Sequence, residues 1–393
     1  MKEIHSNINI IGGGLIGATL AYSLSLLDLK IIITEKKEAY TNLNYNDYRT
    51  VAISEGSKKF FEKINFWNDI KKNAQPIKKI KVIDRKISNS LEFDNNRRSS
   101  NLGYIIKNRY ILDAIYNKLK KSKNVKLIND SNITNFQYEN DLIVTNLNDC
   151  KIISNLNIAA DGKHSFVRNL FKTPVYTKNY NKNALVLTFT HSRDHNSTAF
   201  EFFYKNGPLA ILPMKNIKNK HSSSIVWTNE NYYLKELLKL DNDKLANILN
   251  SNTLHSVGRI NKILTKQLFP LSAHLNTKFY ENKTIYIGDA AHSFHPIAGQ
   301  GWNLGIKDIE NLFYLIQKYK SLGIEIGDSI FCRKYHSDNF YNAYKLYQIT
   351  DKLDNIFQIQ NPFIGLLRST GLNLIQKNKK INNMISDFAM GIN

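Results

Sequence analysis

The sequence predicts an α/β fold that carries an inserted antiparallel sheet and ends in helices. Three observations support this prediction. Near the N-terminus, within residues 8–35, a short apolar strand leads into a glycine-rich turn, a helical pattern and a second strand. Between about residues 181 and 274, several runs alternate polar and apolar residues, as antiparallel strands do. From about residue 331 the pattern is helical.

Composition limits the class of protein. The 393 residues exceed a typical single domain, and 42% of them are apolar, which is enough for a sizeable core. There is no apolar run of about 18 residues, so a spanning helix is not expected. Cys150 and Cys332 are the only cysteines, which argues against a disulfide framework and fits a reducing compartment. Because the N-terminus enters a strand almost at once, with no room for a signal peptide, we expect a cytoplasmic protein.

The formal net charge is +21, from 54 basic and 33 acidic residues. Such a charge suits nucleic acid, an anionic membrane surface or an anionic cofactor, and it can also reflect a general drift in composition. The basic residues are spread along the chain, and no helix-turn-helix, zinc-finger or RNA-binding motif accompanies them. We therefore expect no nucleic-acid partner, and acidic lipid is favoured over it.

A dinucleotide-binding pattern follows the first strand. Gly12, Gly14 and Gly17 form G-x-G-x-x-G between a strand and a helix, and Glu35 ends the second strand. The glycines allow a tight turn, close approach of a pyrophosphate, and close packing of helix and strand. Glu35 can accept hydrogen bonds from ribose hydroxyls and would repel a 2′-phosphate, so FAD or NAD fits better than NADP. The alternative is a glycine turn kept only for packing.

Two further strands end in an aspartate. Asp161 and Gly162 follow the apolar residue Ile158, and Asp289 follows the apolar run that starts at Ile285. An Asp-Gly pair at a strand end is most often a simple turn. With the glycine-rich turn and a second aspartate in the same chain, it becomes a candidate for binding ribose or ribityl hydroxyls.

A glycine-rich segment then opens a helix. Pro296 turns the chain, and Gly299, Gln300 and Gly301 lead into a helix with a stripe of apolar residues expected to be buried: Ile309, Leu312, Phe313 and Ile316. His292 and His295 could suggest a metal site, but no further ligand cluster stands nearby in the sequence, so we expect no metal. His292 is better explained as a hydrogen-bonding neighbour of a cofactor.

Four segments together resemble one family. "GGGLIG", "RTVAIS", "AADGKHSFVR" and "GDAAHSFHPIAGQGWNLGIKD" are similar to motifs of the class A flavoprotein monooxygenases, and the last wording, with the closing "NPFIGLLRSTGLNLI", resembles the ubiquinone-biosynthesis hydroxylases. The resemblance covers essentially the whole chain. It implies a p-hydroxybenzoate-hydroxylase-like fold: a Rossmann-like FAD-binding domain, an inserted antiparallel-sheet substrate domain and C-terminal helices. The expected division is 1–75, 100–180 and 275–330 for the FAD-binding domain, 76–99 and 181–274 for the substrate domain, and 331–393 for the helical region.

The resemblance also implies roles for single residues. The glycine fingerprint and Glu35 would hold the ADP part of FAD, and Asp289 would contact its ribityl chain. The other implied cofactor-binding residues are Arg49 and Arg109 near the flavin and its phosphates, Asp161 with Gly162 beside FAD and the reduced nicotinamide, and Pro296, Gly299, Gln300, Gly301 and Asn303 along the pyrimidine edge of the flavin. Independently of the family, backbone N–H groups at a helix start can stabilise the negative charge of a reduced flavin.

The implied activity is hydroxylation of an aromatic ring. FAD, reduced by NADPH, NADH or a separate electron-transfer protein, would react with dioxygen to form a flavin hydroperoxide that hydroxylates a polyprenylated phenol or quinol in ubiquinone biosynthesis. The sequence offers no evident general base, and the catalytic residues stay unassigned. The inserted sheet would exclude water, and its apolar residues are candidates for the wall of the substrate site or for plain core: Phe202, Phe203, Leu209, Ile211 and Leu212.

Several alternatives remain open at the level of sequence. The same fold could act on a soluble aromatic or an isoprenoid substrate, or serve as a non-catalytic flavin-binding scaffold of a quinone-making complex. Residues 361–391 mix apolar side chains with lysines, which fits either peripheral contact with the inner face of a membrane or packing against the body. Other quinone-biosynthesis proteins could also provide that contact.

Overall fold

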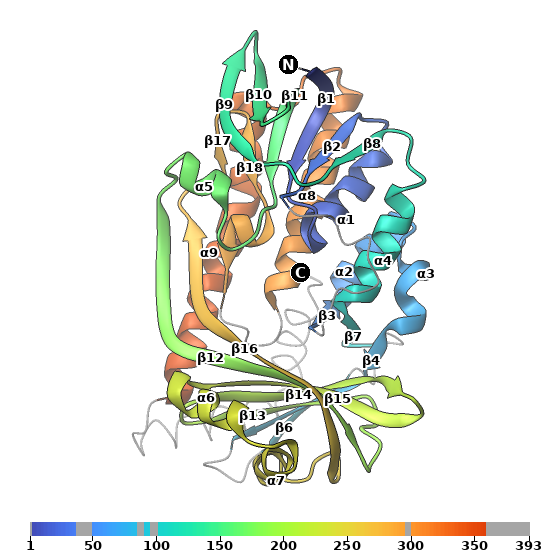
Figure 1. Cartoon of the computed structure of the whole chain (residues 1–393), viewed down its shortest axis with the longest axis vertical. Coiled ribbons are helices and arrows are strands. Elements are labelled where there is room, and N and C mark those ends of the chain that lie inside the picture. Colours follow the sequence, from blue (N-terminus) through green and yellow to red (C-terminus); the bar gives the residue numbers. More distant parts are fainter. Residues whose placement is uncertain (1, 37–48, 85–89, 95–100, 295–299, 359–393) are drawn as a thin grey trace.

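The computed structural model describes residues 2–36, 49–84, 90–94, 101–294 and 300–358. Within these ranges the chain forms three sheets (Figure 1), here called the N-terminal sheet, the small sheet and the middle sheet. The N-terminal sheet comprises β1 (Lys2–Ile11), β2 (Ile31–Thr34), β8 (Val125–Ile128), β9 (Ile133–Glu139), β10 (Leu142–Leu147), β11 (Cys150–Ala159), β17 (Tyr280–Glu281) and β18 (Thr284–Tyr286). The small sheet comprises β3 (Thr50–Ser54), β4 (Gln75–Ile77) and β7 (Gly103–Lys107).

The middle sheet contains β5 (Lys79–Asp84), β6 (Ser90–Asp94), β12 (Val175–His191), β13 (Thr198–Tyr204), β14 (Gly207–Ile217), β15 (Lys220–Glu230), β16 (Ile260–Asn276) and β19 (His292–Ser293). The α-helices are α1 (Leu15–Ser25), α2 (Glu55–Lys63), α3 (Trp67–Ile70), α4 (Asn108–Leu119), α5 (Phe166–Leu170), α6 (Asn231–Lys239), α7 (Asn242–Asn252), α8 (Gln300–Ser321) and α9 (Ser329–Gln358), with 3-10 turns η1 (Lys71–Asn73) and η2 (Gly288–Ala290).

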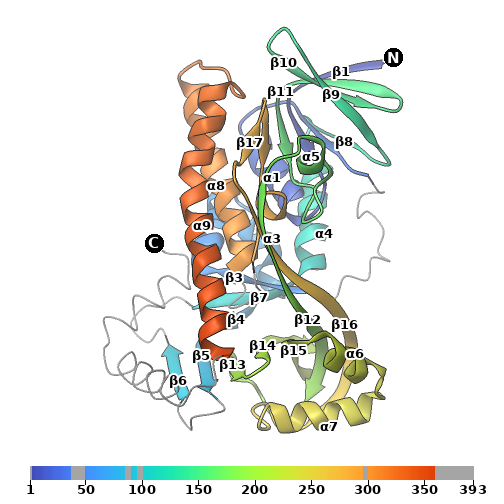
Figure 2. The same ribbon diagram turned by 90° about the vertical axis from the view of Figure 1, so that its left-hand side faces the viewer.

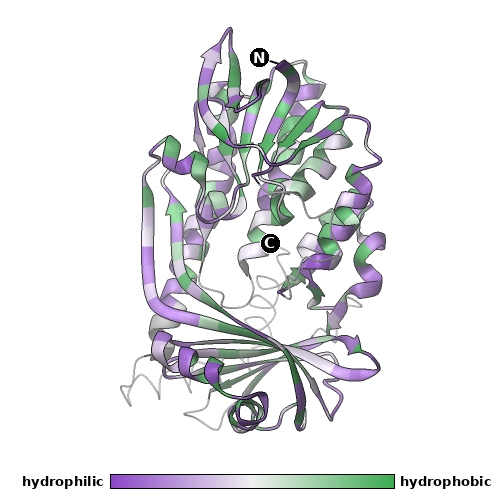
Figure 3. Ribbon diagram, viewed as in Figure 1, coloured by the Kyte–Doolittle hydropathy of each residue, from purple (hydrophilic) through white to green (hydrophobic). Residues whose placement is uncertain are grey.

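The N-terminal sheet has a parallel centre, with strand order β17-β18-β11-β1-β2-β8, and the β9–β10 hairpin extends from β11. The predicted strand–helix–strand unit is confirmed as β1, α1 and β2. Every residue of β2 is buried, as expected for a parallel strand covered on both faces. The largest hydrophobic cluster joins this sheet to α1, α4, α8 and α9. Figure 3 shows a mixture of hydrophobic and hydrophilic residues along α4, whereas eight consecutive residues of α1 are buried.

The middle sheet, at the bottom of Figure 1, has strand order β19-β16-β12-β15-β14-β13-β5-β6. Neighbouring strands in this sheet are antiparallel, except that β13 and β5 are parallel. The predicted alternation is confirmed, because Leu185, Leu187 and Phe189 are fully buried in one cluster with residues of α6 and α7. A turn at residues 205–206 joins β13 to β14, which begins at Gly207 with a φ of +143°.

Long elements connect the two halves of the molecule. The strands β12 and β16 pair along most of their length and run from the middle sheet toward the N-terminal sheet (Figures 1 and 2). Helix α9 lies beside α8 and also contacts β13, β14 and β16, so it spans both halves (Figure 2). The helical pattern predicted from about residue 331 is thus found up to Gln358. No helix in the described ranges is both long and apolar enough to cross a membrane.

Candidate cofactor-binding site

The first loop of the site is the glycine turn between β1 and α1. Gly12 takes a φ of +106°, and a methyl group on it would lie 2.5 Å from the carbonyl oxygen of Ala160. The turn after β1 therefore touches the end of β11, which no residue with a side chain would allow. A methyl group on Gly17 would lie 1.9 Å from the carbonyl oxygen of Gly12, so this glycine lets α1 pack against the turn. Gly14 caps α1 from extended backbone and faces open space.

The acid at the end of β2 folds back onto this turn. The backbone N–H of Gly13 donates a hydrogen bond to Oε2 of Glu35 at 2.6 Å, and the Tyr116 hydroxyl donates to the carbonyl oxygen of Gly13, also at 2.6 Å. Burial, followed by the nearby negative charge of Glu35, raises the pKa of Tyr116, so its hydroxyl stays protonated. The structure therefore places Glu35 beside the glycine turn.

The second loop follows β11 and contains Asp161. Its Oδ2 accepts a hydrogen bond from the backbone N–H of Val167 at 3.1 Å, whereas Oδ1 is buried with no partner among the described residues. Burial raises the pKa of this carboxyl, while hydrogen bonds from Ser165 and from backbone N–H groups lower it. An unpaired buried oxygen is costly unless a ligand hydroxyl satisfies it. The next residue, Gly162, has a φ of +81° and open space at its Cβ position.

The third loop, η2 and β19, packs against the first. A methyl group on Gly288 would lie 3.0 Å from the side chain of Ile16 at the start of α1, and one on Gly305 in α8 would lie 2.7 Å from it. Asp308 of α8 fixes the loop, because its Oδ2 accepts hydrogen bonds from the Gly288 N–H at 3.1 Å and from His292 Nε2 at 2.7 Å. Close packing and a buried pair thus hold the turn that precedes Asp289.

Asp289 faces cations from other segments. Its side chain is solvent-accessible, yet surrounding protein raises the pKa of its carboxyl, and the charges of His292, Lys163 and Arg49 act in the opposite direction. Lys163 comes from the second loop and donates to the carbonyl oxygen of Ser272 at 2.9 Å. Arg49 precedes β3, with its guanidinium 5.8 Å from the ring centre of Phe269. Residues far apart in the sequence thus lie close enough for their charges to act on this carboxylate.

One buried arginine ties the second and third loops together. Arg168 donates from Nη2 to the carbonyl oxygen of Lys163 at 2.7 Å and from Nη1 to that of Ala290 at 3.2 Å. The same Nη1 lies 3.1 Å from Nε2 of His274 in β16. Burial, then the charge of Arg168, lowers the pKa of His274 to about 3, so this ring is neutral and accepts the hydrogen bond.

Arg109 and Asn303 are predicted site residues that lie outside the three loops. Arg109 is half-exposed at the start of α4, with Nε 3.5 Å from Oδ2 of Asp113, and the N–H of the preceding residue, Asn108, donates to the carbonyl oxygen of Arg49. Asn303 is buried, and its side chain bonds to the small sheet and α2 rather than to open space: Oδ1 accepts from the Ser54 N–H and the Ser57 hydroxyl, both at 2.8 Å, and Nδ2 donates to the carbonyl oxygen of Ala52 at 2.9 Å.

The start of α8 completes the predicted set. Gln300 is the first residue of the helix, and Gly301 faces open space at its Cβ position. Pro296 and Gly299 lie outside the described residues, as does His295. The predicted stripe is confirmed, since Ile309, Leu312, Phe313 and Ile316 are all buried. Three strand-end loops and the start of α8 therefore converge on one region.

Comparison with known proteins agrees with this geometry. Residues 5–320 match a family model described as an FAD binding domain. The chain is 30% identical to the mitochondrial ubiquinone biosynthesis monooxygenase COQ6 of Drosophila melanogaster, over 98% of this chain and 90% of that protein. It is 27% identical to the ubiquinone hydroxylase UbiL of Rhodospirillum rubrum, with the same coverage of each. The chain belongs to the class A FAD monooxygenases. Solved structures with this fold include p-nitrophenol 4-monooxygenase PnpA of Pseudomonas putida, with a TM-score of 0.79, 14% identity and coverage of 99% of this chain and 98% of that one.

As a member of the class A FAD monooxygenases, the protein is an oxidoreductase with FAD as its cofactor and with an aromatic substrate and dioxygen as reactants. The residues present fit FAD. At Gly14, Gly162 and Gly301, in the first loop, the second loop and the start of α8, a Cβ atom would meet no other atom within 4 Å, so backbone is open to an approaching cofactor. The unpaired Oδ1 of Asp161 adds a free acceptor in the same region.

Sequence reasoning missed three residues of this monooxygenase site. Arg168 and His274 form the clamp between the loops, and Tyr116 supports the glycine turn from α4. Arg168 lies within the segment that resembles the family, where its position beside Asp161 was a signal. Tyr116 and His274 lie in ordinary helix and strand patterns, and only the packing of α4 and β16 brings them to the site.

For three of the five candidate wall residues, the structure supports the alternative of plain core. Phe202, Leu209 and Ile211 are fully buried in the cluster that α6 and α7 cover, so they form the core of the middle sheet and do not face the flavin-binding loops. Alternation along the strands places Phe203 and Leu212 on the opposite face. Leu212 there packs against a cluster that includes residues of the small sheet.

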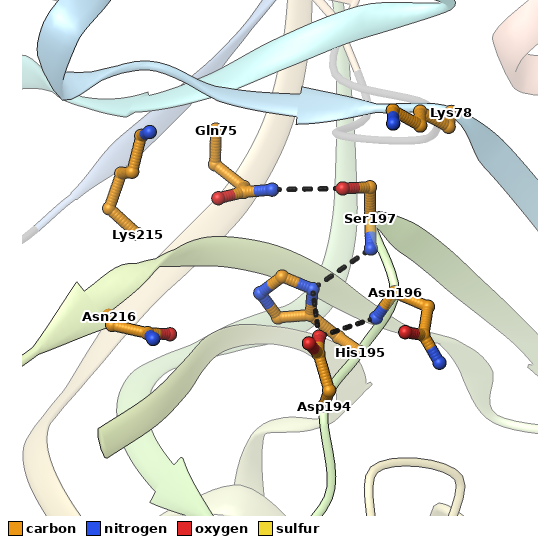
Figure 4. A pocket seen from close by; sticks show the side chains of 8 residues that line it. All are labelled: Gln75, Lys78, Asp194, His195, Asn196, Ser197, Lys215 and Asn216. Atoms are coloured by element: carbon orange, nitrogen blue, oxygen red, sulfur yellow. Dashed lines mark hydrogen bonds and ion pairs between the residues drawn. The ribbon is translucent and has the colours of Figure 1, made fainter. Parts of the chain in front are cut away.

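A separate polar cavity of about 470 Å³ lies at the end of the middle sheet (Figure 4). Its lining comprises Gln75, Lys78, Asp194, His195, Asn196, Ser197, Lys215 and Asn216. Gln75 donates to the Ser197 hydroxyl at 3.1 Å, and the Ser197 N–H donates to His195 Nδ1 at 3.1 Å. None of the three cofactor-binding loops contributes to this lining, so the cavity is distinct from the FAD site.

Proposed function

We propose that this monooxygenase hydroxylates the aromatic ring of a polyprenylated phenol or quinol in ubiquinone biosynthesis. One relative is named a ubiquinone biosynthesis monooxygenase and another a ubiquinone hydroxylase, and both align over 98% of this chain. The observation that carries the proposal is the convergence of the loops after β1, β11 and β18 on one region, where Asp161 and Asp289 present carboxylates beside open backbone.

Each loop has a distinct proposed role. Gly12, Gly14 and Gly17 receive the diphosphate at the N-terminus of α1, where unpaired N–H groups favour negative charge. Glu35 accepts hydrogen bonds from the ribose. The remaining proposed contacts are Arg49 and Arg109 near the flavin and phosphates, Asp161 with Gly162 beside FAD and the nicotinamide, Asp289 at the ribityl chain, and Pro296, Gly299, Gln300, Gly301 and Asn303 at the pyrimidine edge. Because the Asn303 side chain bonds to protein, its contact would come from the backbone.

When bound, FAD would accept two electrons from NADPH, NADH or a separate electron-transfer protein, and the reduced cofactor would activate dioxygen. The chain positions the ring and excludes water. In the proposed division, residues 1–75, 100–180 and 275–330 bind FAD, residues 76–99 and 181–274 cover the substrate, and residues 331–393 form the C-terminal region. The net charge of +21 supports peripheral contact with an anionic membrane, where a prenylated substrate resides, alone or with other quinone-biosynthesis proteins.

Turnover of a short-chain prenylphenol tests the proposal. Purified protein should be yellow, consume dioxygen in the presence of a reductant, and form a product one oxygen atom heavier than the substrate. Protein that binds flavin but oxidises no phenol would instead support the scaffold. Deleting the gene in its host and identifying the accumulated precursor by mass spectrometry separates a quinone precursor from a soluble aromatic or isoprenoid substrate.

A further inference from the structure

Glu201 of β13 is an acid on the face of the middle sheet that looks toward the small sheet. Its sequence neighbours Phe200 and Phe202 both pack in the cluster covered by α6 and α7. Ala199 instead packs in the cluster that contains Ile105 of β7. Because side chains alternate along a strand, Glu201 shares the face of Ala199.

The surroundings of Glu201 are apolar. Across the sheet it stands opposite Val82 of β5 and Ala210 of β14, and the same row continues through Val226 and Val186. No hydrogen bond or ion pair to Glu201 is found within the described ranges. Burial therefore raises the pKa of its carboxyl to about 7, although the chain carries a net charge of +21.

A structural acid in this sheet has different neighbours. Glu92 of β6 lies 3.1 Å from the ammonium group of Lys79 and 3.3 Å from that of Lys81. Burial raises the pKa of its carboxyl, but the two lysines together outweigh this effect and lower it. Glu201 has no such partner and is only partly exposed. An acid held without a partner lowers stability, so its place on this face points to a ligand rather than to the fold.

Packed side chains connect the face of Glu201 to the start of α8. Ala199 and Leu212 of the middle sheet pack in one cluster with Ala52 of β3. The carbonyl oxygen of Ala52 accepts a hydrogen bond from Asn303 in the first turn of α8, 2.9 Å away. Glu201 lies one side-chain position, about 7 Å, beyond Ala199 along β13. Ala199, two residues before Glu201, thus connects this face of the middle sheet to the start of α8 through Ala52.

We propose that Glu201 binds the ring hydroxyl of the aromatic substrate and takes up its proton during oxygen transfer. The O–H bond of the substrate breaks, a new O–H bond forms on the carboxylate, and the electron pair stays on the ring oxygen, which makes the ring more nucleophilic. The proton then leaves to solvent, and no oxidant beyond those of the monooxygenase reaction is required. This inference rests on the proposed function, and it assigns the base that the sequence left open.

Glu201→Gln and Glu201→Asp test the inference, with Glu139→Gln of the exposed strand β9 as the matched control. With a short-chain prenylphenol, the Gln variant should lose about 100-fold or more in hydroxylation rate, the usual contribution of a general base, while keeping its flavin. The Asp variant should recover part of that rate, because it keeps a carboxylate. Wild-type hydroxylation by the Gln variant would overturn the inference.

Binding of the same phenol and of its methyl ether, followed by flavin fluorescence, needs no turnover. The wild type should bind the phenol roughly tenfold or more tightly than the ether, as expected for a hydrogen bond to a charged group, and the Gln variant should lose that preference. An equal preference in both proteins overturns the inference. Wild-type protein that shows the preference but yields no hydroxylated product contradicts the proposed function alone.

Discussion

At the scale of single residues, three carboxyl groups share one property. Burial raises the pKa of Asp161 and Glu201, and surrounding protein raises the pKa of the solvent-accessible Asp289. Removing an acid from water without a full set of partners lowers the stability of the folded state. A hydrogen bond from a ligand hydroxyl would offset this loss of stability. We therefore interpret these carboxyl groups as binding groups.

Asp289→Ala should yield protein that is poor in flavin. The carboxylate is the acceptor proposed for the ribityl hydroxyls, and loss of a hydrogen bond to a charged group weakens binding about 10- to 100-fold. The flavin-to-protein absorbance ratio and titration with FAD measure this change. Asp149→Ala, at an exposed turn, is the control. Full flavin content and normal turnover in the Asp289 variant would show that this loop is misassigned.

Glu201→Gln should stabilise the apoprotein in a pH-dependent way. The pKa of about 7 in the folded state exceeds the value of about 4.3 for a free glutamate, so the folded state binds the extra proton between these values and the wild type loses stability as pH rises through them. Above pH 7 the variant should be more stable by on the order of 1–3 kcal/mol, and near pH 4 the difference should vanish. Urea unfolding at both pH values measures it. A constant difference across the range would contradict this assignment.

At the scale of elements, two close contacts join the loops. Gly17 brings α1 onto the turn at Gly12, and Gly288 with Gly305 makes room for Ile16, so that α1, η2 and α8 meet. Because the strands are parallel, the turns that follow them lie at the same edge of the sheet. The glycines set how closely these turns approach one another. Gly14 lies at the start of the same helix, but a Cβ atom there would meet no protein atom. Its open space is where we propose that the diphosphate binds.

Gly17→Ala and Gly14→Ala should therefore affect different properties: the first should lower stability and the second should weaken FAD binding. A methyl group on Gly17 would clash with a backbone oxygen at 1.9 Å, and such overpacking should lower the free energy of unfolding by about 1–3 kcal/mol. A methyl group on Gly14 meets no protein atom, so stability should stay unchanged while FAD affinity falls. Thermal unfolding of the apoprotein and FAD titration separate the two. A Gly14 variant with normal FAD affinity would place the diphosphate elsewhere.

At the scale of the whole molecule, the two sheets are joined by long elements rather than by a linker. β12, β16 and α9 span both halves, and Arg168 clamps the second and third loops to β16. A shift of the middle sheet would therefore also move the cofactor loops. The formal net charge of +21 is a further property of the whole chain.

The full-length protein should bind vesicles that contain phosphatidylglycerol and should not bind pure phosphatidylcholine vesicles. The attraction is electrostatic, so binding should fall between about 0.1 M and about 1 M salt, where the screening length drops from roughly 10 Å to roughly 3 Å. Cosedimentation measures the bound fraction. Equal binding to both lipids, or to neither, would mean that the charge reflects composition rather than a membrane surface.

The sequence alone determined the strand–helix–strand unit, the alternation in the middle strands, the stripe on α8 and the family. These features are local, because a glycine spacing or a repeat of apolar residues records the backbone conformation around it. Tertiary structure decided which face each residue meets. Phe202 and Glu201 are adjacent in one strand, yet one lies in the core beneath α6 and α7 and the other faces the small sheet. The pKa of Glu201, the clamp made by Arg168 and the support from Tyr116 depend on groups distant in sequence, so only the folded chain shows them.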